Sequence, residues 1–509
     1  MELNSVIESL ENQSILVTGA TGYLAKLFVE KLLRVQPNLK QLFLLIRAPN
    51  SASAAQRFNN EVSGGEVFRV LRAKHGLRYG TFISEKVTPI AGDISLQNLG
   101  INDAQLINNI WKDVDFVANF AANTKFDERY DDAIRTNTLG ARHVAEFSNK
   151  CEKLKLLLHI STAYVWGEKS GLILENPLRM GETLNGTKSP ELDIKVEMKL
   201  VLGRLNELKA NQVSQKEEMI AMKEFGLERA RLFGWPNTYV FTKAMGEMIL
   251  GESKGHDHKV VIIRPPIISS TLKEPFPGWM EGIRTIDSVF LAYGKGKSRC
   301  FPVNPQTVLD VIPGDMVVNA AIVAMVGHGN QPSNENVRFI YHMGSSARAP
   351  LLCSKLLHYA YNYFSKNPMK SPPSKGETFG KPIKIPYPLI FPSVNCFLFF
   401  FYVTCVFPVK VLLMLNTLVF FDYFHDICSN AERTIKLVQR MIELYTPCIF
   451  IGVVRVYFSF DDSNTERLRM EVRLNEAEAN TFYFDPKCIN WEDYFMNIHI
   501  PGLVKYVFK

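Results

Sequence analysis

The chain has 509 residues, of which 47% are hydrophobic and 11% aromatic, and this composition excludes a disordered or fibrous protein. The length favours at least two domains. The formal net charge is +7, from 58 Lys and Arg against 51 Asp and Glu, and the basic residues are scattered. Without a basic block or zinc-finger spacing we expect no nucleic-acid partner, and the charge gives some support for an anionic ligand.

The eight cysteines lie far apart and form no C-x-x-C pair, which indicates buried thiols in a reducing compartment. The N-terminus carries Glu2, Glu8 and Glu11 before any Lys or Arg, and it has no long apolar run. This pattern predicts neither a signal peptide nor a transit peptide.

From residue 15 to roughly residue 345, short apolar runs alternate with longer amphipathic ones, which predicts an α/β fold with a parallel sheet buried on both faces. We expect helices at Tyr23–Val35 and Ala133–Lys150. The expected strands are Ile15–Thr18, Gln41–Ile46, Val87–Ala91, Val114–Phe120, Lys155–Ile160 and Lys259–Ile263.

Two stretches interrupt this alternation. Residues 168–235 form an insertion with a charged run of helical composition, and residues 366–392 are rich in Pro, Lys and Ser and should form an exposed connector. The sequence therefore predicts a first domain over 1–365, which contains the insertion, and a smaller, mostly helical C-terminal domain over 393–509.

The first chemical signal is the segment ILVTGATGYLAKLFVEKLL, in which a strand leads into Gly19-Ala20-Thr21-Gly22 and then into a helix. This is the context of a dinucleotide-binding turn. Gly19 permits the tight turn, Gly22 lets a pyrophosphate approach the backbone, and the helix N-terminus offers N–H groups and a favourable dipole. The alternative is an ordinary strand-to-helix turn.

The second strand ends in QLFLLIRAPN, which places Arg47 where an NAD enzyme would carry an acid for the ribose 2′-hydroxyl. No Asp or Glu occurs between Glu30 and Glu61. A guanidinium here would pair with a 2′-phosphate, which favours NADP(H). Alternatively, Arg47 is a solvated charge at a strand end.

A Y-x-x-x-K pair in WPNTYVFTKAMGEM places Tyr239 and Lys243 on one face of a helix. A neighbouring ammonium lowers the pKa of a tyrosine from its ordinary value of about 10, so Tyr239 becomes a usable proton donor. Upstream, LLLHIS ends in Ser161 and is followed by Thr162, and both hydroxyls could bind a substrate carbonyl oxygen. The pattern is common by chance, and its alternative is a solvated helix face.

This set of residues resembles the extended short-chain dehydrogenase/reductase superfamily and, within it, the alcohol-forming fatty acyl-CoA reductases, especially those of plants. The resemblance covers essentially the whole chain. It rests on these blocks, in order: VTGATGYLAK, VTPIAGDIS, NFAANTKFDERYDDAIRTNTLGA, LLLHISTAYVWGEKSGL, GWPNTYVFTKAMGE, VVIIRPPII, EPFPGWMEG, DVIPGDMVVNA and FYFDPKCINWEDYFMNIHIPGL.

The resemblance implies a Rossmann-type doubly wound sheet that binds NADPH, without a metal. Thr162, with Ser161 beside it, would be the catalytic hydroxyl, Tyr239 the acid, and Lys243 would bind ribose and tune Tyr239. Asn137 resembles the superfamily's helix asparagine near the site, although a structural role is an equal alternative. The cofactor would lie against Gly19, Thr21, Gly22, Tyr23 and Leu24 at the pyrophosphate, Arg47 at the 2′-phosphate, Asp93 and Ile94 beside the adenine, and Ala121 and Ala122 at the nicotinamide ribose.

Two positions depart from the family pattern. Pro266 stands where Ser or Thr is usual, and Trp166 stands where smaller residues are usual. Neither is a proton-transfer residue, but both bear on activity and chain-length preference.

The implied activity is NADPH-dependent reduction of a long-chain fatty acyl-CoA to a primary fatty alcohol through an aldehyde, with release of CoA, as in wax, cuticle or suberin lipid synthesis. One alternative is another extended superfamily member, such as a sugar-nucleotide or steroid dehydrogenase. Another is a catalytically silent NADP-binding regulator or membrane scaffold, against which the intact Tyr239, Lys243 and Thr162 argue. The sequence does not indicate the oligomeric state.

Residues 389–421 are strongly apolar, and no charge occurs from Ile385 through Val409. Prolines interrupt the run, so three interpretations stay open: a transmembrane span, a shallow membrane-contacting hairpin or access surface for the acyl chain, and domain core. Flanking lysines would suit an anionic membrane. We therefore expect peripheral contact with the cytosolic face of the endoplasmic reticulum membrane, or a cytosolic protein, and we expect the insertion 168–235 to help cover the acyl chain.

Overall fold

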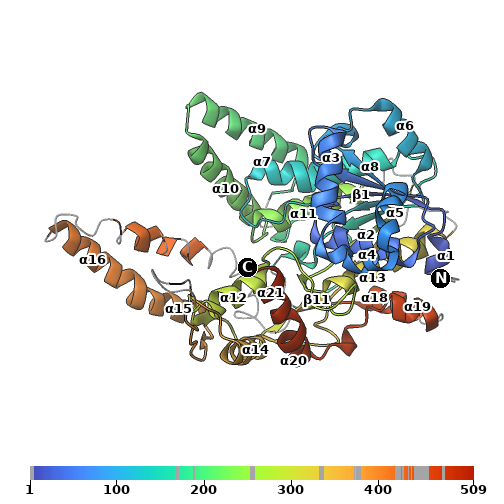
Figure 1. The fold of residues 1–509 in the computed structure, drawn as a ribbon. Coiled ribbons are helices and arrows are strands. Elements are labelled where there is room, and N and C mark those ends of the chain that lie inside the picture. The colour runs from blue at the N-terminus through green and yellow to red at the C-terminus, as the bar shows by residue number, and fades with distance from the viewer. Residues whose placement is uncertain are drawn as a thin grey trace.

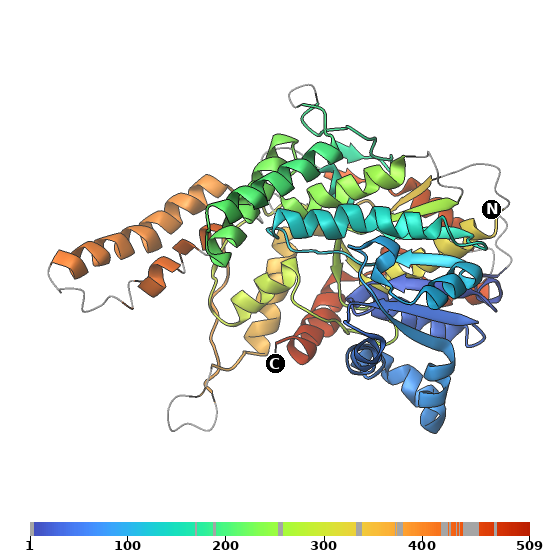
Figure 2. The same cartoon turned by 90° about the horizontal axis from the view of Figure 1, so that it is seen from above.

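The structure is a computed structural model that describes residues 5–167, 171–186, 190–252, 258–331, 338–371, 373, 380–418, 426, 429–433, 435–436, 438–440, 458–472 and 476–508. An α/β body contains most of these residues, and two helical projections extend from the same side of it (Figures 1 and 2).

A parallel sheet forms the centre of the body, and the described residues give it seven strands in the order β12-β7-β5-β4-β1-β2-β3. The chain moves outward from β1 in both directions, which is the doubly wound arrangement and confirms the predicted fold class. All six expected strands form, and the seventh, β12, was not predicted. The bounds are β1 Ser14–Thr18, β2 Gln41–Ile46, β3 Val87–Ala91, β4 Phe116–Asn119, β5 Leu156–Ile160, β7 Lys259–Arg264 and β12 Arg338–His342.

Both faces of the sheet are buried, as the apolar strand sequences predict. Ile15 and Val17 of β1 pack into one core cluster, together with α2 (Tyr23–Val35) and α13 (Gly314–Gly329). Leu16 points to the opposite face and packs into a second cluster with α8 (Gly140–Ser148). Side-chain alternation along each strand therefore supplies both layers.

The helix that carries the Y-x-x-x-K pair is α11 (Thr238–Gly251), and the Asn237 side chain caps its first turn by accepting from the N–H of Val240 at 3.1 Å. It packs against α8 and against η5 (Ile134–Leu139), a π-helical stretch that follows α7 (Tyr130–Ala133). The expected helix over 133–150 thus contains a π-helical turn.

The insertion forms the helical hairpin that its composition predicts, with α9 (Ile194–Ala210) and α10 (Gln215–Leu232). A capping box joins Ser214 and Glu217 at the start of α10. The hairpin is one of the two projections in Figure 1.

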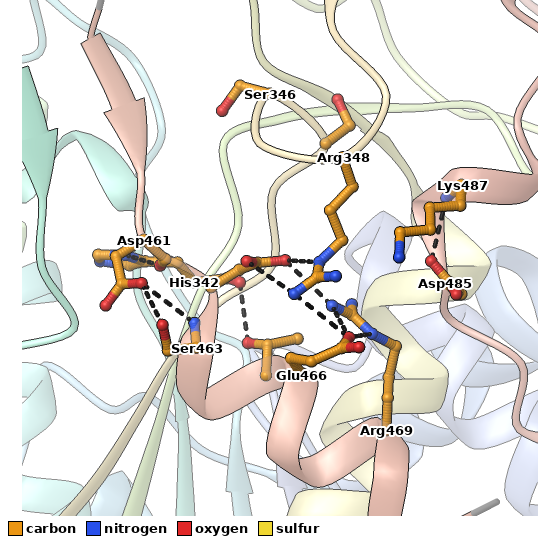
Figure 3. A network of polar contacts seen from close by, with 12 residues as sticks. His342, Ser346, Arg348, Asp461, Ser463, Glu466, Arg469, Asp485 and Lys487 are labelled. Carbon is orange, nitrogen blue, oxygen red and sulfur yellow. Dashed lines mark hydrogen bonds and ion pairs between the residues drawn. The ribbon is translucent and has the colours of Figure 1, made fainter.

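The end of the chain packs into the same core as the sheet. β15 (Phe458–Phe460) pairs in parallel with β6 (Gly171–Ile173) of the insertion, and α18 (Ser463–Val472) lies against β12 and α13. Arg348 and Arg469 converge on the carboxylates of Asp462 and Glu466. Figure 3 shows the two arginines beside Glu466. The predicted domain limits stay a prediction, but the two parts share one hydrophobic core.

The second projection is α15 (Val394–Phe401), η8 (Tyr402–Val406) and α16 (Phe407–Leu418). Among the described residues, Val394–Leu415 is the one helix long and apolar enough to cross a membrane, with a mean hydropathy of 2.2. Only 6% of its most apolar window is buried. The described residues therefore leave most of this helix outside the hydrophobic core, which argues against the domain-core interpretation.

The remaining described elements complete the fold. They are α1 Val6–Ser9, α3 Ser51–Arg57, η1 Phe58–Ser63, η2 Glu66–Phe68, α4 Arg69–His75, η3 Gly76–Arg78, α5 Tyr79–Lys86, η4 Gln97–Gly100, α6 Ala104–Asp113, η6 Ala163–Trp166, β8 Ile267–Ser269, α12 Thr285–Gly294, β9 Cys300–Pro302, β10 Val308–Leu309, β11 Val311–Pro313, β13 Leu351–Leu352, α14 Cys353–Lys366, β14 Leu389–Phe391, α19 Glu476–Thr481, η9 Pro486–Cys488, α20 Trp491–Asp493, η10 Tyr494–His499 and α21 Ile500–Tyr506.

The packing of α11 on η5 requires glycine at position 246, because a Cβ there would lie 2.4 Å from the carbonyl oxygen of Asn137. We expect Gly246→Ala to lower the free energy of unfolding by about 1–3 kcal/mol, as overpacking does. The matched control is Gly203→Ala in α9, where a Cβ meets open space, and there we expect a gain of about 0.8–1 kcal/mol. Urea unfolding of both variants checks the pair, and equal changes would contradict the packing argument.

Candidate functional site

The predicted site residues lie at the carboxyl ends of neighbouring parallel strands. Gly19 follows β1 and Arg47 follows β2, while Asp93 and Ile94 lie just beyond β3. On the other side of β1, Ala121 and Ala122 follow β4, and Ser161 and Thr162 follow β5. The edge includes the point between β1 and β4 where the strand order reverses, which is where doubly wound sheets bind ligands.

The turn after β1 is built on a close backbone approach. Gly19 has a φ of +68°, and a Cβ there would lie 2.6 Å from the backbone nitrogen of Ala121. The N–H of Gly22 donates to the Gly19 carbonyl at 2.8 Å, and Gly22 is the N-cap of α2 without any side-chain cap. The first N–H groups of α2 are thus left for an anion, so the turn fits a dinucleotide pyrophosphate.

Several predicted cofactor residues contribute only their backbone to this edge. The Tyr23 hydroxyl donates to the Ser269 carbonyl at 2.9 Å, and the Leu24 and Ile94 side chains are buried in the core. Thr21 is half-buried beside the exposed Gly22. The Asp93 carboxylate accepts from the N–H of Ser95 at 2.8 Å.

Arg47 is exposed at the end of β2. Among the described residues its guanidinium has no hydrogen bond or ion pair. Arg57 lies beside the backbone of Arg47, because the Arg57 Nη1 donates to the Arg47 carbonyl at 2.5 Å. The Arg57 guanidinium also forms an ion pair with Glu61. Arg57 was not singled out from the sequence, since its proximity to Arg47 depends on how α3 folds back on the strand end.

The helix α11 presents Tyr239 and Lys243 to the same edge. Tyr239 is half-buried, and its ring stacks on that of Phe126, with centroids 5.9 Å apart and planes at 17°. Lys243 is buried and donates to the carbonyl of Ile160 at 2.7 Å. Burial lowers the pKa of Lys243 to about 8, against the opposing charge of Glu247.

The two hydroxyls after β5 differ in their hydrogen bonding. Thr162 is the N-cap of η6, and its Oγ1 accepts from the N–H of Tyr164 at 3.3 Å, so its own proton remains available to donate. Within the described residues the buried Oγ of Ser161 has no hydrogen-bond partner. A buried hydroxyl without a hydrogen-bond partner costs free energy unless a ligand supplies the partner. The segment η6, which Thr162 caps, packs against α11, the helix of Tyr239 and Lys243.

Asn137 has a structural role in the loop after β4. Its side chain accepts from the N–H of Asn123 at 2.8 Å and donates to the Asn123 carbonyl and to the Thr242 hydroxyl, each at 3.0 Å. Asn137 therefore joins this loop to α11, which is a structural role. A role of Asn137 in the reaction stays a prediction.

A buried ion pair fixes the far end of α11. The carboxylate of Glu247 accepts from the Arg264 guanidinium at 2.5–3.1 Å, and both side chains are at most 1% exposed. The same guanidinium donates to the carbonyl of Asn176 at 2.9 Å and lies 5.9 Å from the ring centroid of Trp166. Trp166, which departs from the family pattern, therefore packs against this ion pair. Pro266, the other departure, is buried just after β7.

Comparison with known proteins identifies the family. Residues 17–321 match an NAD-binding family model described as "Male sterility protein", and residues 413–509 match a second model with the same description. The alcohol-forming fatty acyl-CoA reductase of Simmondsia chinensis is 48% identical over 506 residues, which cover 99% of each chain. This chain belongs to the fatty acyl-CoA reductase family.

Two further comparisons agree. Fatty acyl-CoA reductase 1 of Arabidopsis thaliana is 45% identical and aligns over 100% of both chains. The reductase domain of a non-ribosomal peptide synthetase from Mycobacterium tuberculosis has a TM-score of 0.56 and 15% identity, and the match covers 99% of this chain and 96% of that one. At this identity the structural likeness speaks for the fold alone.

The buried pair of Glu247 and Arg264 predicts a non-additive pair of substitutions. Arg264→Met leaves a buried carboxylate without its partner and should lower the free energy of unfolding by about 3–5 kcal/mol. Adding Glu247→Leu should restore most of that loss, because apolar residues of similar volume replace both charges. Denaturant unfolding of the single and double variants measures the coupling, and additive losses would show that the pair is not a unit.

Proposed function

We propose that this protein reduces a long-chain fatty acyl-CoA to the primary fatty alcohol and releases CoA, with NADPH as reductant. The observation that carries the proposal is its 48% identity, over 99% of both chains, to an enzyme named for that reaction. The residues at the carboxyl edge of the sheet support it, because two hydroxyls follow β5 there and α11 presents a tyrosine and a buried lysine to the same edge.

Bound NADPH would supply the hydride for each of the two reductions. Thr162 would donate a hydrogen bond to the thioester oxygen, the Ser161 hydroxyl would donate a second one, and Tyr239 would transfer its proton to the developing oxyanion. The Lys243 ammonium would favour ionisation of Tyr239 and so make it a better acid. As the C–S bond breaks, the hydroxyl proton of the hemithioacetal would return to the Tyr239 phenolate, so that CoA thiolate leaves and an aldehyde remains. The same groups can reduce this aldehyde with a second NADPH.

No cysteine nucleophile is needed for this sequence of steps. Cys151 is buried, and burial raises the pKa of its thiol to about 12. A thiol in that state is a poor nucleophile. The proposal therefore has the hydride attack the thioester directly, without an acyl-enzyme.

Product analysis tests the function. Purified protein given palmitoyl- or stearoyl-CoA should consume two NADPH per CoA released and yield the primary alcohol, with little aldehyde trapped by hydroxylamine. Each buried CH₂ of the acyl chain contributes about 0.8 kcal/mol to retention of the aldehyde while the cofactor exchanges. A ratio of one with oxime accumulation would show an aldehyde-forming enzyme, and no turnover would reject the function.

Tyr239→Phe isolates the proton donor, since phenylalanine keeps the stacked ring beside Phe126 and removes only the hydroxyl. We expect kcat to fall by about 10²–10⁴-fold, with NADPH binding, followed by its fluorescence, largely unchanged. Activity within tenfold of the parent would refute the role of Tyr239.

The cofactor preference rests on Arg47, supported by its neighbour Arg57. The parent should use NADPH far better than NADH. Arg47→Asp should raise the KM for NADPH and narrow the preference, because a carboxylate repels the 2′-phosphate and can bind a 2′-hydroxyl. Equal use of both cofactors by the parent would contradict the assignment.

We further propose that the helix Val394–Leu415 contacts the cytosolic face of the endoplasmic reticulum membrane. The support is its exposed apolar surface, on which Phe399 is 72% and Phe407 54% exposed, and the nearby Lys410. It projects from the same side of the body as the α9–α10 hairpin (Figures 1 and 2). We propose that these two projections cover the acyl chain.

Membrane contact predicts that Phe399→Ser with Phe407→Ser moves the protein from the bound to the free fraction in flotation with anionic phospholipid vesicles. Leu77→Ser is the matched control, because Leu77 is a fully exposed apolar side chain between α4 and α5. Vesicle binding that is lost equally with the control, or that is absent in the parent, would count against this surface.

A further inference from the structure

A buried imidazole connects Lys243 to the centre of the sheet. The Nε2 of His159 lies 3.2 Å from the Nζ of Lys243. Its other ring nitrogen, Nδ1, lies 3.0 Å from the side-chain nitrogen of Asn119. The Oδ1 of Asn119 in turn accepts from the Thr18 hydroxyl at 2.6 Å. The four side chains form one chain of polar contacts from α11 through β5 and β4 to β1.

The strand register creates this chain. Thr18 pairs with Asn119 and Asn119 pairs with His159 as direct partners in neighbouring parallel strands. All four side chains are at most 2% exposed. At its far end the N–H of Ala121 donates to the Thr18 hydroxyl at 3.4 Å, so the chain ends at the turn that approaches the backbone of Gly19.

The imidazole of His159 is neutral. Burial first, and then the charge of Lys243, hold the pKa of His159 well below its ordinary value. A neutral imidazole carries one N–H and one lone pair, so the contacts of its two nitrogens must have opposite sense. If Asn119 donates to Nδ1, then Nε2 donates to Lys243, and if Asn119 accepts from Nδ1, then Nε2 accepts from Lys243.

Two arrangements satisfy both nitrogens of the imidazole. With Asn119 donating to Nδ1, the ring proton is on Nε2 and points at Lys243, which must then be a neutral amine. If the Asn119 amide turns by half a rotation, its oxygen accepts from Nδ1–H, its nitrogen donates to the Thr18 hydroxyl, and Nε2 accepts from the Lys243 ammonium. The chain thus has one arrangement for each protonation state of the lysine.

We propose that His159 is a positioning residue of the reductase site, which holds the Lys243 side chain and, through Asn119 and Thr18, stabilises its ammonium form. This inference rests on the proposed function of Lys243. The charged arrangement gains more from the contact, because hydrogen bonds to an ammonium are roughly twice as strong as neutral ones. Removing the acceptor must therefore favour the neutral amine.

The other groups that face Lys243 have defined roles. Glu247, one helical turn along α11, favours the ammonium, but it is itself neutralised by Arg264 from β7. Tyr239 lies one turn before Lys243, and from β5 the Ile160 carbonyl accepts one of the three ammonium protons. Within the described residues, the other group at hydrogen-bond distance from the Lys243 Nζ is His159, and its removal leaves the groups named above in place.

Three substitutions separate the two ends of the imidazole. His159→Gln can present an amide at the position of Nε2, which can accept from or donate to Lys243, whereas His159→Asn reaches only the position of Nδ1 and the Asn119 side chain. His159→Leu removes both contacts. His328→Leu is the control for loss of a buried imidazole, because His328 packs on Phe339 near the opposite ends of the strands.

The measurement is the alkaline limb of kcat/KM for NADPH and, in parallel, the pH dependence of NADPH binding by fluorescence without acyl substrate. Loss of a hydrogen bond to a charged group corresponds to a pKa shift of roughly one unit or more. We expect His159→Asn and His159→Leu to move both alkaline limbs down by about one unit. His159→Gln and the His328→Leu control should keep the limbs of the parent.

The pattern of shifts tests whether the contact of Nε2 with Lys243 stabilises the ammonium. If all three His159 variants keep the parental limbs, the inference is overturned, and if all three shift alike, the contact of Nε2 with Lys243 is not the cause. Thermal unfolding identifies a variant that fails to fold, in which case Asn119→Leu, which releases Nδ1 without touching His159, must show the downward shift instead. A parent that binds NADPH but does not reduce acyl-CoA rejects the proposed function while the binding limb still tests this inference.

Discussion

The burial of a lysine ammonium at the carboxyl edge of the sheet is the constraint on which the site depends. An ammonium inside a protein needs acceptors in fixed positions, and Lys243 finds one in the Ile160 carbonyl, where β5 ends. Four residues along α11, Glu247 meets the buried Arg264 of β7. Two buried polar contacts to two different strands therefore set the rotation and height of α11, and with them the place of Tyr239.

The fold could be predicted from the sequence because the strands are apolar on both faces and the turn after β1 is a local motif. β12 was missed because Arg338 and Phe339 are only half-buried at the sheet edge, so its sequence lacks a continuous apolar run. The contact between His159 and Lys243 was also beyond prediction. It depends on the register of β1, β4 and β5 and on the docking of α11, none of which is encoded in a short segment.

The C-terminal residues bear on the reductase site through packing rather than chemistry. The Tyr494 hydroxyl donates to the Ser270 carbonyl at 2.7 Å, and His499 contacts both the Ser270 hydroxyl and Asp287. Ser270, His499 and Asp287 have the residue types of a hydrolytic triad, but each is fully buried. These contacts join the end of the chain to the loop after β8 and to α12, so the C-terminal part packs directly against the reductase part.

Protonation of Lys243 has opposite effects on folding stability and on the proposed activity. Its pKa is about 8 in the folded chain, below the ordinary value of about 10.4, so between these values the unfolded chain binds the proton more tightly. Linkage then makes this group's contribution to stability rise with pH across that interval. The charge that is proposed to support Tyr239 is lost as the pH rises through this folded pKa. The fold therefore holds the ammonium at a cost that is largest below pH 8, where the proposed proton donor Tyr239 would be supported best. The Ile160 carbonyl and the charge of Glu247 reduce that cost.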